Sequence, residues 1–391
     1  VDNTAWDVSA KQDKSIIAWY ETSNNKGALK VHIGSNDEIF ANQNSSYLFA
    51  NIGRANICTA TEAITNINLL NVTGVKNMTG MFNKTGYTAM TNLDLGTKFD
   101  TSNVTEMTGI FAETGYNAMT VLNLGDKFDT SNVTRMSGMF MRTGYTAMTS
   151  LDLKDKFDTG KVTEMSYMFQ ETGYTAMTRL NLENKFDTSN VTDMRFLFYK
   201  TGYTAMTNLD LGEKFNTSKV NDMGGMFQET GYTAMTSLDL KDKFDTSNVH
   251  SMDGMFQETG YTAMTSLNLG DKFDTSKVTQ MIKMFAGTGY TAMTSLDLGD
   301  KFNTSNVHSM GGIFQETGHI AMTSLDLGPA FTRLAGENSE RGIQTRASDA
   351  IPDEYMFYDA GKENEITIYA SEQIYLDKNN FKADTNATES L

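Results

Sequence analysis

The chain has 391 residues and a formal net charge of −16 at neutral pH, from 48 acidic and 32 basic side chains. Such an acidic surface repels phosphate backbones and anionic lipid, which argues against nucleic acid or a membrane surface as partner. There is no run of 18 apolar residues, so we expect no membrane insertion. The single cysteine, Cys58, excludes an internal disulfide. We expect Cys58 to be a buried apolar side chain, with a free thiol that links two chains as the alternative.

Residues 1–70 lack the phrase that is repeated through the middle of the chain, and we predict that they form an N-terminal cap. Residues 15–22 and 29–35 are rich in β-formers and are separated by a polar turn, which predicts a β-hairpin. The cap is expected to cover the open end of the array that follows, because terminal units of a repeat protein need a polar outer face. A separate binding domain is the alternative.

Residues 71–331 form the repeat region. A phenylalanine closes each copy at a constant interval, and successive positions always differ by 29: Phe82, Phe111, Phe140, Phe169, Phe198, Phe227, Phe256, Phe285 and Phe314. A fixed period of this length is the signature of a stacked repeat array. Each coil cannot bury its apolar face alone, so neighbouring coils are expected to share one continuous core.

One copy predicts a strand, a turn and a short helix. Leu93 and Leu95 alternate with polar residues, as in the strand of a leucine-rich repeat. Val104, Met107 and the Ile110-Phe111 pair have the spacing of an apolar helical stripe. The predicted fold class is therefore an α/β repeat solenoid: a leucine-rich-repeat-like, right-handed array of about nine 29-residue coils with a cap at each end.

Residues 332–391 change character again and are predicted to form a C-terminal cap and tail. Residues 355–361 resemble a final, degenerate closing phenylalanine, and residues 366–376 have the composition of a capping strand. Residues 335–350 and 378–391 are polar, and we expect the last segment to be frayed.

Several residue types recur at one position per coil. Most of the 26 methionines fall in such ladders and are expected to fill the core. Aspartates form two ladders, which begin at Asp94 and Asp100. We expect lysines such as Lys98 and turn capping by the carboxylates to relieve their repulsion, with structural calcium as the alternative. No other cofactor is expected.

A tyrosine ladder runs from Tyr87 to Tyr290. We interpret it as packing over the return loop, with a carbohydrate platform as the alternative. His250 and His308 share a solvent-facing position and are expected to be surface substitutions rather than a metal pair. We find no spacing typical of a nucleophile and its base, of a zinc site or of a phosphate-binding loop, so we expect no enzymatic activity.

Variation between copies concentrates near the closing phenylalanine of the middle coils. Tyr167 and Phe196 occupy a position that most copies fill with glycine. Aromatic side chains with arginine are typical of binding hot spots. We therefore predict an aromatic and basic ligand-binding patch on the acidic rod, with neutral drift as the alternative; its residues are Met141, Arg142, Tyr167, Arg195, Phe196, Tyr199 and Lys200.

The phrase FDTSNVTEMTGIF at residues 99–111 recurs with small changes at 128–140 and 186–198. It resembles the BspA-like leucine-rich-repeat surface proteins of mycoplasmas and Gram-positive bacteria, a group also described as a domain of unknown function. Residues 5–21 and 44–52 resemble the leader that precedes those arrays. The chain lacks the cysteine that often follows the closing phenylalanine in the family, and its GYTAM segment enlarges the coil. No ligand-binding residue is transferred from the family.

The resemblance implies a secreted or cell-surface bacterial protein that adheres to a protein or glycan on a host or neighbouring cell. The chain begins at Val1 without methionine or a visible signal peptide, which we interpret as a processed or trimmed chain and as a hint of secretion. The alternative is a structural subunit that associates end to end, because a head-to-tail contact that does not close produces a filament.

Overall fold

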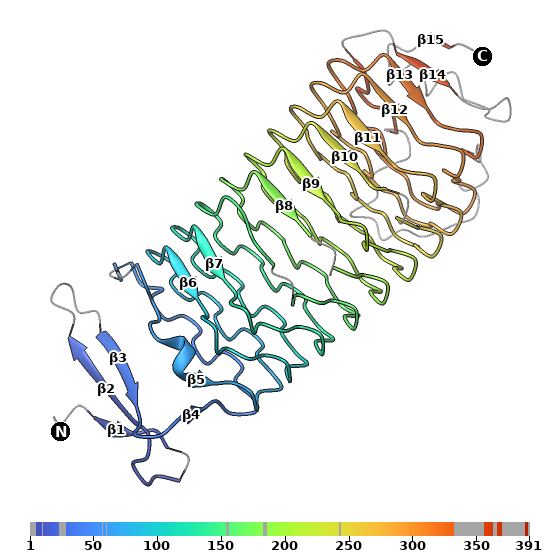
Figure 1. Cartoon of the computed structure of the whole chain (residues 1–391). Coiled ribbons are helices and arrows are strands. Elements are labelled where there is room, and N and C mark those ends of the chain that lie inside the picture. Colours follow the sequence, from blue (N-terminus) through green and yellow to red (C-terminus); the bar gives the residue numbers. More distant parts are fainter. Residues whose placement is uncertain are drawn as a thin grey trace, which may run out of the picture.

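The computed structural model describes residues 5–9, 11–22, 29–56, 58–59, 61–153, 156–182, 186–241, 244–331, 356–362, 366–369 and 388–389. The chain forms an elongated solenoid, with a small antiparallel sheet at its N-terminal end and strands β13 and β14 near its C-terminal end (Figure 1). Its long axis is perpendicular to the coils, so each coil contacts the one before it and the one after it.

Short parallel strands line one side of the solenoid. In the first of them, Leu93 is buried and Asp94 is exposed, which confirms the predicted alternation. Partners in adjacent coils are one repeat period apart, as in the pairing of Leu93 with Leu122. The strands are β6 (Asn92–Asp94), β7 (Val121–Asn123), β8 (Arg179–Asn181), β9 (Asn208–Asp210), β10 (Ser237–Asp239), β11 (Ser266–Asn268), β12 (Ser295–Asp297) and β13 (Ser324–Asp326).

A second ladder of parallel bridges runs along another side of the solenoid. It links ten successive positions, Asn44, Asn77, Glu106, Arg135, Glu164, Asp193, Asp222, Ser251, Gln280 and Ser309. The structure is therefore a solenoid of about ten coils. From Asn77 onward each step equals the repeat period, whereas the first step, from Asn44 to Asn77, is longer.

The predicted short helices are absent from the described coils, and the α/β assignment is wrong. The predicted stripe of Val104, Met107, Ile110 and Phe111 is fully buried, but only Ile110 and Phe111 belong to a run of turns, which begins at Thr108. Alternate N–H groups of that run bond to the next coil, as Phe82 does to the Ile110 carbonyl at 2.8 Å, while the others bond three residues back. The fold is a β-solenoid, and η1 (Ile67–Leu69), a 3-10 turn, is the only helix among the described residues.

Ladders of identical side chains fill the core. The closing phenylalanines stack from coil to coil, with ring centroids 5.7 Å apart for Phe111 and Phe140. The methionine ladders are buried as well, as Met90, Met107 and Met139 illustrate. Because each coil contributes the same shapes, a well-packed contact between two coils is repeated along the whole rod.

Threonines also form buried ladders. The Thr143 hydroxyl donates to the Phe111 carbonyl of the preceding coil at 2.7 Å, and the Thr130 hydroxyl donates to the Asp158 carbonyl of the following coil at 2.7 Å. Both threonines are fully buried. A buried hydroxyl needs a partner, and these bonds provide one in every repeat.

The N-terminal region contains the predicted hairpin, formed by β2 (Ile17–Thr22) and β3 (Leu29–Gly34), with β1 (Trp6–Asp7) paired to β2. Beyond it, β4 (Ile39–Phe40) pairs in parallel with β5 (Leu70–Asn71). The Tyr47 N–H bonds to the Thr79 carbonyl at 2.9 Å, so a first coil already precedes the predicted start of the repeats. Cys58 is a free, half-buried cysteine.

At the C-terminal end, Phe357 is buried and stacks on Phe314 at 5.3 Å, which confirms the predicted degenerate closing phenylalanine. Strand β14 (Thr367–Tyr369) extends the parallel ladder from β13 and pairs with β15 (Thr388–Glu389). The predictions for residues 335–350, and for most of 378–391, fall outside the described residues.

Candidate functional site

Each closing turn has several residues with a left-handed backbone, including a ladder of charged residues that begins at Lys84, and one of these positions, with φ between 54° and 64°, is filled by glycine in most coils. We call it the glycine slot; its members are Tyr47, Gly80, Gly109, Gly138, Tyr167, Phe196, Gly225, Gly254, Lys283 and Gly312. Glycine adopts this conformation freely, which explains why it predominates. A bulky residue there is an outlier, and strained residues concentrate at functional sites.

Three of the predicted site residues form an aromatic cluster, which we define as Tyr167, Phe196 and Tyr199. The Tyr167 and Phe196 rings stack with centroids 5.3 Å apart, and Tyr199 meets the edge of Phe196 at 5.6 Å. Tyr167 is exposed, whereas Phe196 and Tyr199 are half-buried. The Phe196 ring lies over the glycine of the next coil, because a Cβ added at Gly225 would lie 2.3 Å from it.

The predicted basic residues are all paired with carboxylates. Arg142 contacts Glu171 at 3.1 Å, and these hydrogen bonds raise the pKa of the Arg142 guanidinium. Lys200 contacts Glu229 at 3.2 Å, and Arg195 contacts Asp193 at 2.7 Å. Arg142 and Lys200 belong to a ladder whose charge alternates in sign from coil to coil: Lys84, Glu113, Arg142, Glu171, Lys200 and Glu229. The predicted patch is therefore mainly aromatic in character.

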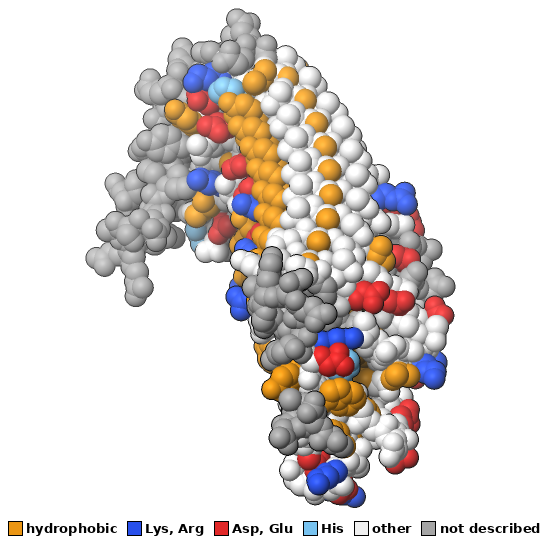
Figure 2. Space-filling model, turned by 90° about the vertical axis from the view of Figure 1, so that its left-hand side faces the viewer, with side chains coloured by type: hydrophobic (Ala, Val, Ile, Leu, Met, Phe, Trp, Pro, Cys, Tyr) orange, Lys and Arg blue, Asp and Glu red, His pale blue; other side chains and the backbone are white. Residues whose placement is uncertain are grey.

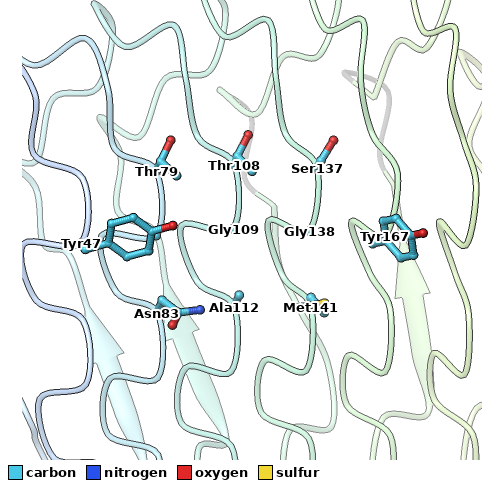
Figure 3. Close-up of a pocket in the computed structure, with 11 residues that line it drawn as sticks. Tyr47, Thr79, Asn83, Thr108, Gly109, Ala112, Ser137, Gly138, Met141 and Tyr167 are labelled. Atoms are coloured by element: carbon cyan, nitrogen blue, oxygen red, sulfur yellow. The ribbon is translucent and has the colours of Figure 1, made fainter.

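A shallow trough of about 290 Å³ crosses the coils from Tyr47 to Tyr167, the first member of the aromatic cluster. Tyr47 and Tyr167 stand at its two ends (Figure 3). Its floor is the backbone of Gly80, Gly109 and Gly138. The hydroxyl groups of Thr79, Thr108 and Ser137 form one edge. The amide of Asn83 and the apolar side chains of Ala112 and Met141 form the other edge.

Met141 and Tyr167 are the predicted site residues that line this trough. Tyr47 was missed because its coil is longer than the repeat period and lies in the predicted cap. The signal was present in the sequence: residues 44–49 read NSSYLF and residues 77–82 read NMTGMF, so Tyr47 aligns with Gly80 when the asparagines and phenylalanines are matched.

The tyrosine ladder is a packed stack, which supports the packing interpretation. The rings of Tyr116 and Tyr145 are 4.5 Å apart and nearly parallel, and His319 continues the stack from Tyr290 at 4.6 Å. Each inner ring covers the faces of its neighbours. Burial, with the neighbouring tyrosines, raises the pKa of Tyr116 to about 12. An unbroken row of hydrophobic side chains follows the long axis on the face shown in Figure 2.

The aspartate ladders cap turns. Asp94 accepts the Gly96 N–H at 2.9 Å, and Asp100 accepts the Ser102 N–H at 3.0 Å. Hydrogen bonds from Ser102, with the charge of Lys127, hold the pKa of Asp100 below its ordinary value. Within the described ranges, no three His, Cys, Asp or Glu side chains gather as metal ligands. The same ranges contain no helix of the length and apolarity that a bilayer span requires.

Comparison with known proteins gives one family. The family model described as "Mycoplasma protein of unknown function, DUF285" matches four overlapping stretches, at residues 55–176, 114–237, 174–286 and 231–324. Neither a curated protein nor a solved structure matches the chain. The matched stretches together cover more than half of the sequence, and the chain therefore belongs to the DUF285 family.

Proposed function

We propose that this protein is a non-enzymatic, BspA-like surface protein of a bacterium. It acts outside the cell, where one face of the solenoid binds a protein or glycan on a host or neighbouring cell. The repeated FDTSNV phrase supports the BspA-like assignment. The aromatic cluster is the observation that carries the binding function.

The aromatic cluster has the features of a binding surface rather than of a stabilising one. Tyr167 and Phe196 have left-handed backbones, with φ of 62° and 54°, each at a cost of about 1–2 kcal/mol relative to glycine. Neither ring is among the fully buried core side chains. Backbone bonds to the following coil hold the two turns in place, since the Tyr167 N–H bonds to the Arg195 carbonyl and the Phe196 N–H to the Gly224 carbonyl. Preorganised aromatic rings lose little entropy on binding.

The test is a double substitution, Phe196→Gly with Tyr199→Ala. Glycine suits the left-handed backbone at residue 196, so the variant keeps its coil intact. We expect its binding to a panel of immobilised matrix proteins and glycans to weaken by about tenfold or more. Lys283→Gly, the same type of change at a distant glycine slot, is the matched control. Equal binding by the double variant and the wild type would sink the proposed role of the cluster.

A structural subunit that associates end to end is the second candidate. The first coil exposes large apolar side chains, including Phe40 and Leu69, which are 62% and 63% exposed. Burial of these side chains against the far end of a second copy would stabilise a head-to-tail contact. Negative-stain images over a range of concentrations, with and without calcium, test this candidate. Concentration-dependent fibres that Phe40→Ser with Leu69→Ser abolishes would support it, and isolated rods at all concentrations would exclude it.

A further inference from the structure

The trough between Tyr47 and Tyr167 has the chemistry of a carbohydrate site. We propose that it binds a short, neutral oligosaccharide that lies along the axis of the solenoid. This inference rests on the proposed function and extends the candidate site from Tyr167 to Tyr47, a residue that the repeat pattern did not point to.

Tyr47 offers a ring face to a ligand. It is 59% exposed although its φ is 58°, so the strained side chain gains little from burial. A Cβ added at Gly80 would lie 2.3 Å from the ring, which shows that the ring lies over the glycine of the next coil. The outer face of the ring is left open. Sugar rings carry C–H groups that pack on such faces, in the same way as other partly apolar rings do.

The floor beyond Tyr47 is open. A Cβ added at Gly109 or Gly138 would meet nothing closer than 3.7 Å. The trough ends at Tyr167, whose ring is fixed by its stack on Phe196. From the coil of Tyr47 to the coil of Tyr167 there are four coil spacings, or about 19 Å at the usual distance between paired strands. This length suits a ligand of several linked rings.

The backbone of the floor has no free groups for a peptide strand. The Gly109 N–H bonds to the Ser137 carbonyl at 2.9 Å, and the Gly138 N–H bonds to the Ser166 carbonyl at 2.9 Å. The carbonyls of both glycines accept N–H groups three residues downstream, from Ala112 and Met141. A bound strand pairs through main-chain groups, and none is offered here. The polar contacts must therefore come from side chains.

The edges of the trough supply such contacts. Thr79 and Asn83 have side chains without a hydrogen-bond partner among the described residues, whereas the Thr108 hydroxyl donates to Glu106 and can still accept, and the Ser137 hydroxyl accepts from Ser166 and can still donate. The Thr79, Thr108 and Ser137 hydroxyls point the same way in Figure 3. Hydroxyl and amide groups both donate and accept, as sugar hydroxyls do. None of the eleven lining residues is charged, on a chain of net charge −16. The trough therefore favours a neutral glycan over an anionic one.

The experiment is a binding screen of the full chain against an array of neutral and anionic oligosaccharides. Titration of the best neutral tetrasaccharide by calorimetry follows. Two variants test the trough: Tyr47→Gly removes the open ring, and Gly138→Lys fills the floor. Each variant has a matched control at a glycine slot outside the trough: Lys283→Gly for Tyr47→Gly, and Gly254→Lys for Gly138→Lys. The natural residue Lys283 shows that the glycine slot accepts lysine.

We expect Kd for the neutral oligosaccharide to rise about tenfold or more in both trough variants, and to be unchanged in both controls. Circular dichroism and thermal unfolding establish that each variant is folded. If Gly138→Lys is unfolded, Tyr47→Gly still decides the question, because glycine suits that backbone. Any of three outcomes overturns the inference: the chain binds only anionic glycans, Tyr47→Gly leaves the binding unchanged, or the chain binds no glycan. Protein binding that depends on Phe196 and Tyr199 would then still support the proposed function.

Discussion

The Thr143 hydroxyl donates a 2.7 Å hydrogen bond to the carbonyl oxygen of Phe111 in the coil before it. That oxygen also accepts the Thr114 N–H at 2.9 Å, so both of its lone pairs are used inside the core. The same bond joins Thr172 to Phe140 one coil later. The threonine that precedes the glycine in each closing turn is thus a cross-link between coils.

Thr143→Val keeps the shape of the side chain and removes this cross-link. We expect the free energy of unfolding to fall by about 1 kcal/mol, the net worth of one buried bond to a carbonyl that keeps its other partner. Urea unfolding measures the change. Thr134→Val is the control, because the exposed Thr134 hydroxyl makes a similar bond to the Thr105 carbonyl at 3.2 Å in contact with water. Equal losses in the two variants would contradict the role given to burial.

Two glycines with similar backbones should differ in their tolerance of alanine. Gly138 has φ of 61° and open space beside it, so Gly138→Ala carries only the backbone cost of about 1–2 kcal/mol. Gly144 has φ of 53°, and a Cβ there would lie 2.5 Å from the Met148 Cβ. We expect Gly144→Ala to lose about 2–4 kcal/mol, because a steric clash adds to the backbone cost. Denaturant midpoints of the two variants give the comparison; similar midpoints would show that the turn relaxes around Met148.

Asp253 should make stability depend on pH. Burial raises its pKa above the ordinary 3.8, although its carboxylate accepts the Ile282 N–H at 2.7 Å. The folded protein therefore binds a proton more readily than the unfolded chain. The contribution of protonated Asp253 to the free energy of unfolding is therefore greatest below the ordinary pKa, and it declines as the pH rises through the raised pKa. Asp253→Asn keeps the accepting oxygen without the charge.

We accordingly expect Asp253→Asn to be more stable than the wild type at neutral pH and to lose that advantage as the pH falls below the raised pKa. Urea unfolding at a series of pH values from neutral to acidic measures the difference. Asp94→Asn, at an exposed turn-capping carboxylate, is the control. A constant difference between the Asp253 variant and the wild type at all pH values would refute this assignment.

The tyrosine stack should resist ionisation. Burial raises the phenol pKa of Tyr116 to about 12, from an ordinary value of 10.0, and raises that of Tyr145. The contribution of the neutral phenols to the free energy of unfolding is therefore retained below pH 10, and it is lost as the pH rises through the raised phenol pKa values. Phenolate absorbance of the native protein should appear at higher pH than that of the urea-unfolded chain. Coincident titration curves would mean that the rings are open to water.

The period of the sequence predicts most of the fold, because the buried positions repeat. Leu93, Met107 and Phe111 are buried as their spacing predicts. The helix was predicted wrongly because the same spacing also suits a run of turns whose N–H groups bond to the neighbouring coil. Thr108 and Gly109, both weak helix formers in the middle of that segment, are the signal that favours turns.

The residues of the candidate site could be predicted only in part. Comparison of copies identified Tyr167 and Phe196, which stack on each other. It could not show that Arg142 and Lys200 face carboxylates in the next coil, because pairing across coils depends on the three-dimensional register. Tyr47 was missed for a different reason: the extra residues of the first coil displace it from the repeat period.

The number of coils between Tyr47 and Tyr167 sets the distance between their rings. Each coil bonds only to its neighbours, so duplication of one unit beyond Tyr167 would lengthen the rod and leave this distance unchanged. Duplication of a unit between the two tyrosines would separate them by one more coil, about 4.8 Å. Under the glycan binding that we propose, duplications of this kind would let related chains accommodate oligosaccharides of different lengths between the same two rings.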